Sequence, residues 1–384
     1  MRRIVLALDS LKGSIAAADA VAEIASGWRS VDPLVGTDLR PMADGGEGTL
    51  AAFAEAVAGA TRIPVAVTGP HGRSVDASWL RLPDGTGVVE LASTSGIELL
   101  GDDRRPWDAG TIGFGQAIAA ALDADVQRLV LGIGSSASTD GGAGMLSAIG
   151  ARILNGSGEP IGPGARGLRD ATSVDLSGIR PLPSGGVVVL SDVTSPLIGP
   201  HGAAAVFGPQ KGLDAADVEA ANAALARFAD LVIAARSGVP VSAGARRANT
   251  VPLGLHTEIP GAGAAGGTGF ALLAWGAALR PGAAEVADLV GLRAAIARAD
   301  LVVTGEGSFD GQSAAGKVPT LVAGLADAAG VPVALVAGRI ARDADTSAFA
   351  ASVSLTQLAG SAASSLAEPA RWLRAAGAAL ARNL

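Results

Sequence analysis

The sequence predicts an α/β protein in which a Rossmann-like doubly wound parallel-sheet domain, formed by both chain ends, is interrupted by an inserted second α/β domain. Three observations support this. Strand-like and helix-like patterns alternate near both ends, and several strand-like runs are continuously apolar, as in parallel strands covered on both faces. The chain of 384 residues is also long for a single core. We place the Rossmann-like domain at residues 1–66 and 284–384 and the inserted domain at residues 67–283.

The elements of the Rossmann-like domain follow the order expected for alternating strands and helices. Its N-terminal part predicts a strand at residues 3–8, a helix at 16–28, a short strand before Pro41 and a helix after Gly48. Its C-terminal part predicts a helix at 283–298, strands at 300–304, 331–337 and 351–355, a helix at 320–329 and a last helix from Ser365.

The inserted domain differs because long loops and hairpin turns separate its strands. Turn signals lie at residues 70–72 and 83–87, and strand-like runs lie at 129–131 and 186–190. No disordered linker stands out, so we expect short crossings between the two domains.

The composition limits what this protein can bind. A net charge of −7, a pI near 5.1 and few aromatic residues argue against nucleic-acid binding, so we expect small-molecule partners. The absence of cysteine excludes disulfides and thiolate sites. The histidines, His71, His201 and His256, lack the close spacing of a zinc site.

The N-terminal sequence lacks the apolar core of a secretion signal, so we expect a cytoplasmic protein. An uncharged run at residues 259–279 has the length of a membrane span, but its glycine-rich first half favours a buried loop and helix. We therefore expect no membrane association. A monomer and a homodimer both remain open.

A glycine-rich acidic loop, PMADGGEGT at residues 41–49, is the most informative local feature. Its carboxylates, Asp44 and Glu47, suit one Mg²⁺ ion with a bound phosphate. They also suit a capping box, with Asp44 at the N-cap and Glu47 three residues later, ahead of an apolar helix pattern. The loop by itself does not decide between the two interpretations.

Two further polar loops of the Rossmann-like domain follow predicted strands, where ligands bind in open parallel sheets. DSLKGS, residues 9–14, places Ser10 and Lys12 beside a helix start, and the alternative is a solvated lysine with an ordinary cap. GEGSFDGQSAAGK, residues 305–317, carries Glu306, Asp310 and Lys317 after the predicted strand.

The second of these loops is close to a P-loop motif. We reject a P-loop because Val318 stands where the Mg²⁺-binding Ser or Thr is required, and because the predicted strand ends several residues too early. We keep an anion-binding loop.

The inserted domain supplies two more loops with suitable chemistry. In residues 132–145 the hydroxyls of Ser135, Ser136, Ser138 and Thr139 suit phosphate oxygens, whereas a glycine-rich turn with Asp140 as N-cap is the alternative. In residues 191–212, Asp192 at a strand end suits a general base or a metal ligand, or a carboxylate that holds backbone amides; Lys211 is expected in a tight loop.

Together these loops offer carboxylates, lysines and phosphate cradles, while no Ser/His/Asp hydrolase motif or histidine metal set is evident. Phosphoryl transfer fits this set, because it needs positioning, Mg²⁺ and positive charge more than a special nucleophile.

The chain resembles the bacterial glycerate kinases of the garK/glxK type, the glycerate 2-kinases. Six motifs follow in that family's order over nearly the whole chain: DSLKGS, PMADGGEGT, GSSASTDGGAGM, SDVTSPLIGPHGAAAVFGPQKG, GAAGGTGF and TGEGSFDGQSAAGK. The resemblance implies ATP-dependent phosphorylation of D-glycerate, with 2-phosphoglycerate as the expected product. It also implies a Rossmann-like domain split by a second α/β domain, with the active site in the cleft between them.

The resemblance leads us to expect three catalytic residues. Asp192 would take the hydroxyl proton. Lys12 would hold triphosphate or carboxylate charge, and Asp44 would face Mg²⁺ or substrate hydroxyls. Lys211, which is not in the catalytic set, would share the role of Lys12. The expected Mg²⁺ ligands are Asp44, Glu47 and Asp192. The residues expected to bind substrate or phosphate are Ser10, Glu47, Ser136, Thr139, Asp140, Lys211, Glu306, Asp310 and Lys317.

Four positions depart from the family pattern. Ser135 stands where a glycine is usual, Ser191 and Ser195 flank Asp192 where Cys and Asn are common, and Gln116 replaces a frequent Glu. None removes a charged group with an expected role, so they bear on substrate detail more than on reaction type.

Other functions are compatible with parts of this pattern. A nicotinamide-dependent oxidoreductase should carry GxGxxG after the first strand, and DSLKGS is not that motif. A non-catalytic module that binds nucleotides or organic acids, and a kinase of a related small hydroxy acid, remain open.

Overall fold

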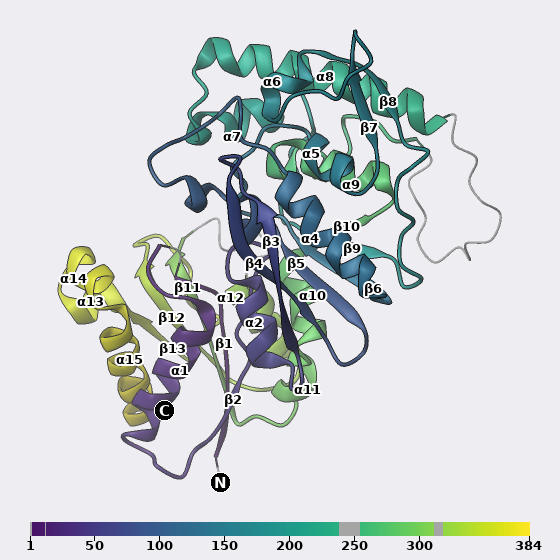
Figure 1. Ribbon diagram of the computed structural model, residues 1–384. Helices are drawn as coiled ribbons and strands as arrows, with labels where there is room; N and C mark the ends of the chain where they lie inside the picture. The colour runs from purple at the N-terminus through teal and green to yellow at the C-terminus, as the bar shows by residue number, and fades with distance from the viewer. Residues whose placement is uncertain (1, 12, 238–253, 311–317) are drawn as a thin grey trace. The chain divides into compact units, whose positions relative to one another are not determined.

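The structure is a computed structural model that describes the chain except residues 1, 12, 238–253 and 311–317 (Figure 1). It consists of two compact units. The terminal unit comprises Met1–Asp44, Gly48–Ala58 and Gly282–Leu384; the middle unit comprises Gly45–Glu47 and Gly59–Pro281. The first long crossing comes earlier than residue 66, because the strand at Thr61–Thr68 pairs along its whole length with a strand of the middle unit.

The terminal unit contains one five-stranded parallel sheet with the order β13-β12-β11-β1-β2. Its strands are β1 Arg3–Leu8, β2 Gly36–Leu39, β11 Leu301–Phe309, β12 Val333–Ile340 and β13 Ala351–Ser354. Its helices are α1 Ala17–Arg29, α2 Thr49–Ala56, α10 Gly282–Leu289, α11 Leu292–Ile296, α12 Val318–Ala328, α13 Leu355–Ala359, α14 Ala362–Ala367 and α15 Pro369–Asn383.

This strand order is that of the flavodoxin-like doubly wound fold, with the first and third strands of the unit, β1 and β11, in the middle. The direction of winding reverses between these two strands. Ligands of such sheets bind at this switch point, outside the carboxyl ends of the strands. The predicted fold class is confirmed.

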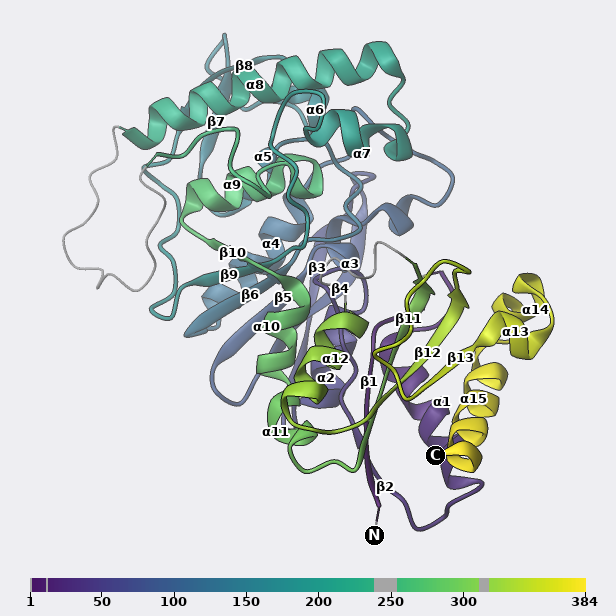
Figure 2. The same ribbon diagram turned by 180° about the vertical axis from the view of Figure 1, so that it is seen from behind.

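Helices α1 and α15 cover one face of this sheet (Figure 1). Apolar residues of both helices, among them Ile24, Trp28 and Leu373, pack in one core with Ile4 and Leu6 of β1. Figure 2 shows α12 on the opposite face, behind the strands as seen from α1.

The middle unit contains a six-stranded mixed sheet with the order β10-β9-β6-β5-β4-β3 and a two-stranded sheet of β7 and β8. Its strands are β3 Thr61–Thr68, β4 Ser74–Arg81, β5 Thr86–Glu90, β6 Arg128–Gly132, β7 Arg152–Asn155, β8 Ala171–Asp175, β9 Val187–Leu190 and β10 Ala278–Arg280. Its helices are α3 Ala92–Ser95, η1 Ile97–Leu100, α4 Ile112–Asp123, α5 Ala143–Ala148, α6 Gly164–Leu168, α7 Ala203–Lys211, α8 Ala215–Ser237, η2 Ala264–Gly267 and α9 Thr268–Trp275.

Both hairpin turns predicted for the middle region are confirmed, because β3 pairs with β4 and β4 with β5 in antiparallel fashion. The uncharged run at residues 259–279 forms η2, α9 and the start of β10. Among the described residues, no helix combines the length and the apolar character needed to cross a membrane.

Three predicted elements differ from the observed ones. β11 continues to Phe309 rather than Thr304, because residues up to Phe309 pair in register with β12 and Phe309 is buried. The predicted helix at 283–298 is broken into α10 and α11 at Gly291, which has a φ of +67°. The C-terminal helix begins at Pro369, after α13 and α14.

Candidate functional site

The acidic loop at residues 41–49 is where the chain passes from the terminal unit to the middle unit and back. Gly45, at a φ of +96°, lies so close to the end of β9 that a Cβ would be 2.5 Å from the Leu190 carbonyl oxygen. Its own carbonyl accepts a 3.0 Å hydrogen bond from Gly134 N. The loop is glycine-rich because its backbone packs directly on the segments that follow β6 and β9.

The capping interpretation of this loop is wrong. Helix α2 begins at Thr49, with Gly48 at the N-cap and no side-chain cap hydrogen bond. Asp44 therefore lies four positions before the N-cap and Glu47 lies outside the helix. Both side chains are exposed, which leaves the ligand-facing interpretation as the remaining prediction.

At the β1–β11 switch point of the terminal unit, the negative charges of Asp44 and Glu306 act on the carboxyl group of Asp9. Asp9 directly follows β1, and its pKa is raised to about 7 by burial, by the negative charge of Asp44 and by that of Glu306. The backbone N–H of Ser10 donates a 2.7 Å hydrogen bond to Asp9 Oδ1 and opposes this shift. Like charges gathered at a ligand-binding edge are a common sign of a functional site.

Asp9 was not among the predicted site residues. An acidic residue directly after the first strand of a doubly wound sheet was the signal that could have found it. Glu306 lies within β11 and is only 7% exposed, so it is a strand residue and not the loop residue that we expected. Asp310 follows the last residue of β11, and Ser10 is half-buried. Lys12 and Lys317 lie outside the described residues.

The longer β11 also changes one argument against a P-loop. The strand ends two residues before Gly311, so the objection that it ends too early is wrong. The other objection holds, because Val318 opens α12 without the required hydroxyl.

In the middle unit, a buried lysine supports the loop at residues 134–142. Lys211 is the last residue of α7, not part of a tight loop as expected, and it is 3% exposed. Its ammonium donates hydrogen bonds of 2.9 Å to Ser136 Oγ and 2.5 Å to the Ser138 carbonyl oxygen. Burial lowers its pKa to about 7, and Asp140 opposes this effect.

Two buried hydroxyls lie in the same loop. Ser138 Oγ and Thr139 Oγ1 have no hydrogen-bond partner among the described residues, although their residues are at most 1% exposed. Buried polar groups are nearly always paired, so such exceptions require an explanation. Two unpaired hydroxyls on one short loop, together with a buried ammonium that contacts this loop from α7, are donors of the type that bind an anion.

Asp140 is held by the protein itself. Its carboxylate accepts hydrogen bonds from Thr111 N, Thr111 Oγ1, Gly142 N and Gly144 N at 2.8–3.2 Å. These bonds tie the loop to the start of α4. The N-cap of α5 is Gly142 and not Asp140, so that part of the alternative is wrong. The bonds show that Asp140 holds the glycine-rich turn, while its role toward phosphate stays a prediction.

The GAAGGTGF segment packs against the same loop. The carbonyl of Gly266 accepts a 3.0 Å hydrogen bond from Gly141 N, and a Cβ on Gly266 would lie 2.0 Å from the Ser138 carbonyl oxygen. The glycines of this segment therefore permit close backbone packing that holds the 134–142 loop in place.

Asp192 lies two residues after the end of β9 and is exposed. The neighbouring Ser191 N donates a 3.0 Å hydrogen bond to the Arg280 carbonyl oxygen, which continues the β9–β10 pairing. Asp192 thus stands at the carboxyl edge of the middle sheet, and its expected role as a base stays a prediction.

Two of the departures from the family pattern now have a structural context. Ser135 has a φ of +58°, a left-handed conformation that favours glycine, which accounts for the usual residue there. Gln116 Oε1 accepts a 2.7 Å hydrogen bond from Thr68 N and its Nε2 donates to Thr68 Oγ1 at 3.3 Å, so it joins α4 to the end of β3. A carboxylate oxygen could accept the first bond equally well.

No group of three or more His, Cys, Asp or Glu side chains within the described part of the chain could hold a metal ion. Mg²⁺ in phosphoryl-transfer sites commonly takes one or two protein carboxylates together with substrate phosphates. The crowded carboxylates of Asp9, Asp44 and Glu306 are oxygen donors of the type that Mg²⁺ prefers.

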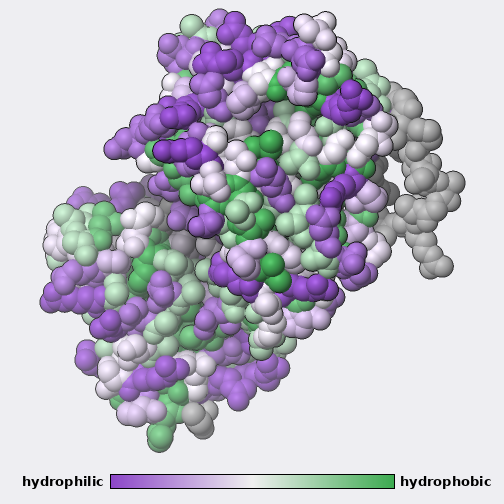
Figure 3. All heavy atoms as spheres, in the orientation of Figure 1, coloured by the Kyte–Doolittle hydropathy of each residue, from purple (hydrophilic) through white to green (hydrophobic). Residues whose placement is uncertain are grey.

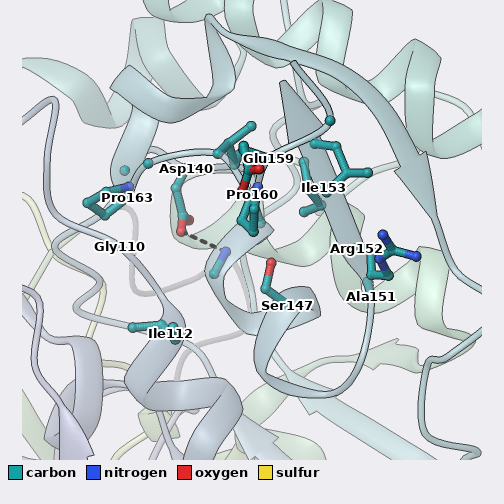
Figure 4. Close-up of a pocket in the computed structure, with 17 residues that line it drawn as sticks. Gly110, Ile112, Asp140, Ser147, Ala151, Arg152, Ile153, Glu159, Pro160 and Pro163 are labelled. Carbon is teal, nitrogen blue, oxygen red and sulfur yellow. Dashed lines mark hydrogen bonds between the residues drawn. The ribbon is translucent and has the colours of Figure 1, made fainter. Parts of the chain in front are cut away.

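A cavity of about 590 Å³ in the middle unit lies between the start of α4, α5, β7 and the 158–164 loop (Figure 4). Asp140 reaches its wall, but the carboxylate is turned to Gly144 N (Figure 4). The walls are mainly apolar, and neither Lys211 nor Ser136 lines it. It therefore does not match a small, strongly hydrophilic substrate.

The whole sequence has clear relatives. It matches the Glycerate kinase family over residues 4–384. It is 42% identical over 349 residues to the glycerate kinase of Bacillus subtilis (strain 168), which covers 89% of this chain and 86% of that protein. It is 39% identical over 348 residues to the glycerate 2-kinase of Escherichia coli (strain K12), with 89% and 86% covered.

A solved structure gives the same result at the level of the fold. The crystal structure of a protein provisionally titled glycerate kinase 2 from Salmonella typhimurium LT2 is similar, with a TM-score of 0.81 and 36% sequence identity. The similarity covers 100% of this chain and 98% of that one.

Proposed function

Because the chain belongs to the glycerate kinase family, we propose that it transfers the terminal phosphoryl group of ATP to D-glycerate and releases 2-phosphoglycerate and ADP. The name of the Escherichia coli relative, glycerate 2-kinase, supports the position of the phosphate. The observation that carries the proposal is the buried Lys211 ammonium beside the unpaired hydroxyls of Ser138 and Thr139, because an anion is the ligand that these donors lack.

In the middle unit, the 134–142 loop binds a phosphate or the glycerate carboxylate. Lys211 supplies the positive charge, and Ser136, Ser138 and Thr139 supply hydroxyl donors. A bound anion favours the protonated ammonium and raises the pKa of Lys211 above its value of about 7. A bound anion therefore increases the fraction of this lysine that is cationic near neutral pH.

Asp192 takes the proton of the glycerate hydroxyl as the oxygen attacks the phosphoryl group. Its place at the carboxyl edge of the middle sheet supports this role. Asp192→Asn should leave the fold intact and lower kcat by about 10²-fold or more. A near-normal kcat would remove Asp192 from the role of base.

In the terminal unit, one or two of the carboxylates of Asp9, Asp44 and Glu306 would hold Mg²⁺ together with phosphate oxygens of ATP. Glu47 and Asp192 stay predicted Mg²⁺ ligands, and Asp310 stays a predicted substrate-binding residue. When bound, Mg²⁺ neutralises phosphate charge during the transfer. Ser10, Lys12 and Lys317 bind phosphate. A cation at this position also relieves the repulsion that raises the pKa of Asp9.

The decisive measurement is ADP release from ATP and Mg²⁺ with and without D-glycerate. Release that depends on glycerate supports the kinase, while ATP binding without turnover would instead support a non-catalytic binding module. Phosphorus NMR of the product distinguishes the 2-phosphate from the 3-phosphate by their proton couplings. Other small hydroxy acids in the same assay define the substrate range. A cytoplasmic location and the oligomeric state stay predictions.

A further inference from the structure

A small pocket of about 220 Å³ opens within the terminal unit, at the carboxyl ends of its strands. Leu11 after β1, Ser308 of β11, Leu355 of α13, and Ser365 and Leu366 of α14 line it together with Ser14. None of these residues belongs to the catalytic set described above.

Two glycines leave room for this pocket. Gly307 of β11 and Gly338 of β12 both line it. They occupy neighbouring positions of paired strands, because Glu306 is in register with Ala337 and Ser308 with Arg339. Gly307 shares its face of β11 with Leu301 and Val303, which pack in the same core as Leu355. Nearer the starts of the two strands, side chains fill this core, whereas Gly307 and Gly338 have no side chain to fill the corresponding space.

The chemistry of the lining selects the class of ligand. Three leucines supply apolar surface and three serines line the pocket as well, and none of the lining side chains that the structure describes is charged. An uncharged group with an apolar body and polar edges fits.

The size of the pocket limits the size of the ligand that it can hold. Its volume is below the range of about 300–1,000 Å³ typical of pockets that hold a whole drug-sized ligand. It can take a single planar ring system, such as a purine, but not a complete nucleotide.

A bound planar ring would explain why one apolar side chain at this pocket is exposed. Leu366 is 61% exposed, whereas Leu355 and Leu11 are at most 3% exposed. Figure 3 shows apolar residues at the surface over the α13–α14 segment. A flat ring against Leu366 would cover part of this apolar surface.

The position of the pocket agrees with the rest of the unit. It lies on the same strand ends as the switch point, where Asp9 follows β1 and Glu306 immediately precedes Gly307. A nucleotide with its base in the pocket therefore keeps its phosphates on the edge of the sheet that carries the carboxylates.

We propose that this pocket binds the purine base of the phosphoryl donor, between Leu11, Leu355 and Leu366 and over Gly307 and Gly338. The assignment rests on the proposed kinase function, because it is that function which requires a nucleotide.

The test measures nucleotide and glycerate separately in three variants of the full chain. Leu366→Ala removes apolar contact from an exposed position, so its fold should be unaffected, and Ser365→Leu adds bulk at a buried position that lines the pocket. Leu34→Ala is the matched control, because Leu34 is 77% exposed in the same unit and does not line the pocket. ADP affinity is measured by calorimetry, and KM values for ATP and glycerate by ADP release.

Leu366→Ala should raise the ADP Kd and the ATP KM about fivefold and Ser365→Leu by about tenfold or more, with kcat and the glycerate KM within about twofold. Adenosine, which has no phosphate, should compete with ATP and should bind more weakly to both variants. Leu34→Ala should match the wild type.

Failure of this assignment and of the proposed function are distinguishable. If the wild type phosphorylates glycerate but both pocket variants keep its ADP Kd and ATP KM, the pocket is not the base site. If ADP binding weakens in the variants while no enzyme form phosphorylates glycerate, the pocket assignment stands and the proposed function fails. A wild type that binds no ADP overturns the assignment.

Discussion

At the residue scale, lysine occurs in this chain only at positions of the predicted site. The three lysines, Lys12, Lys211 and Lys317, are all residues that we predicted to bind anions, and every other cationic side chain apart from histidine is an arginine. Unlike arginine, lysine shifts its pKa readily when buried. Lys211, with a pKa lowered to about 7, is the described example.

Lys211 gives stability a specific dependence on pH. Its pKa is lower in the folded chain than the usual 10.5, so between about pH 7 and pH 10 the unfolded state binds more protons and the folded state gains stability as pH rises. Lys211→Met should remove this gain. The difference in unfolding free energy, wild type minus variant, should therefore increase from pH 7 to pH 9, with a slope of at most about 1.4 kcal/mol per pH unit.

The measurement is urea unfolding at several pH values. Arg62→Met is the control, because Arg62 is exposed and its replacement should change stability equally at each pH. A constant difference between wild type and Lys211→Met across this range would contradict a lowered pKa.

Ser135 carries a backbone cost that glycine would avoid. A left-handed conformation costs an L-residue about 1–2 kcal/mol, and glycine gives back part of this through its freer unfolded chain. Ser135→Gly should thus stabilise the protein by up to about 1 kcal/mol, measured by the urea midpoint. Ser135→Ala keeps the strain and should give no gain; equal midpoints for both variants would argue against strain at this φ of +58°.

The sequence identified site residues where their position along a strand was enough. The carboxyl ends of parallel strands meet at one edge of the sheet. The polar residues in the loops that follow these strands could therefore be assigned to the site from the sequence. The sequence could not reveal that Lys211 is buried, that Asp140 is saturated by backbone donors, or that Asp9 is crowded by Asp44 and Glu306. Each depends on segments distant in the chain.

At the element scale, apolar runs predicted strand cores well and strand ends poorly. β1 was predicted with its observed bounds, because its apolar run and its strand coincide. β11 extends through Gly305–Phe309, where glycines and polar residues hide the pattern and the pairing with β12 decides. The predicted boundary after residue 66 cuts through β3, because the sequence did not show that this strand pairs along its whole length with β4 of the middle unit.

The contact between α1 and α15 depends on two glycines. A Cβ on Gly27 would lie 1.9 Å from the Arg374 carbonyl oxygen, and a Cβ on Gly377 would lie 2.2 Å from that of Ile24. Gly27→Ala should therefore destabilise the protein by about 1–3 kcal/mol, because the helices must separate. Chemical denaturation measures the loss.

Gly324→Ala in α12 is the matched control. No atom lies within 4 Å of a Cβ at Gly324, so alanine there should raise stability by up to about 1 kcal/mol through its helix propensity. If both substitutions raised stability, close helix packing would not be the reason for Gly27.

At the scale of the whole molecule, chain connectivity divides the two units unequally. The terminal sheet needs both chain ends, because β1 lies between β2 and β11. β11 begins about 260 residues after β2 ends. The middle unit is almost entirely one continuous segment, and only Gly45–Glu47 comes from elsewhere. Its own sheet and core involve no strand of the other unit.

We therefore expect residues 59–281 to fold alone and to unfold cooperatively in urea, since this segment holds all six strands of the large middle sheet. Residues 1–58 alone should remain unfolded, because two strands without β11 cannot form a stable sheet. Circular dichroism of the two fragments, followed through urea titration, makes the comparison. A segment 59–281 that melts gradually would mean that Gly45–Glu47, packed on the ends of β6 and β9, is required to complete the middle unit.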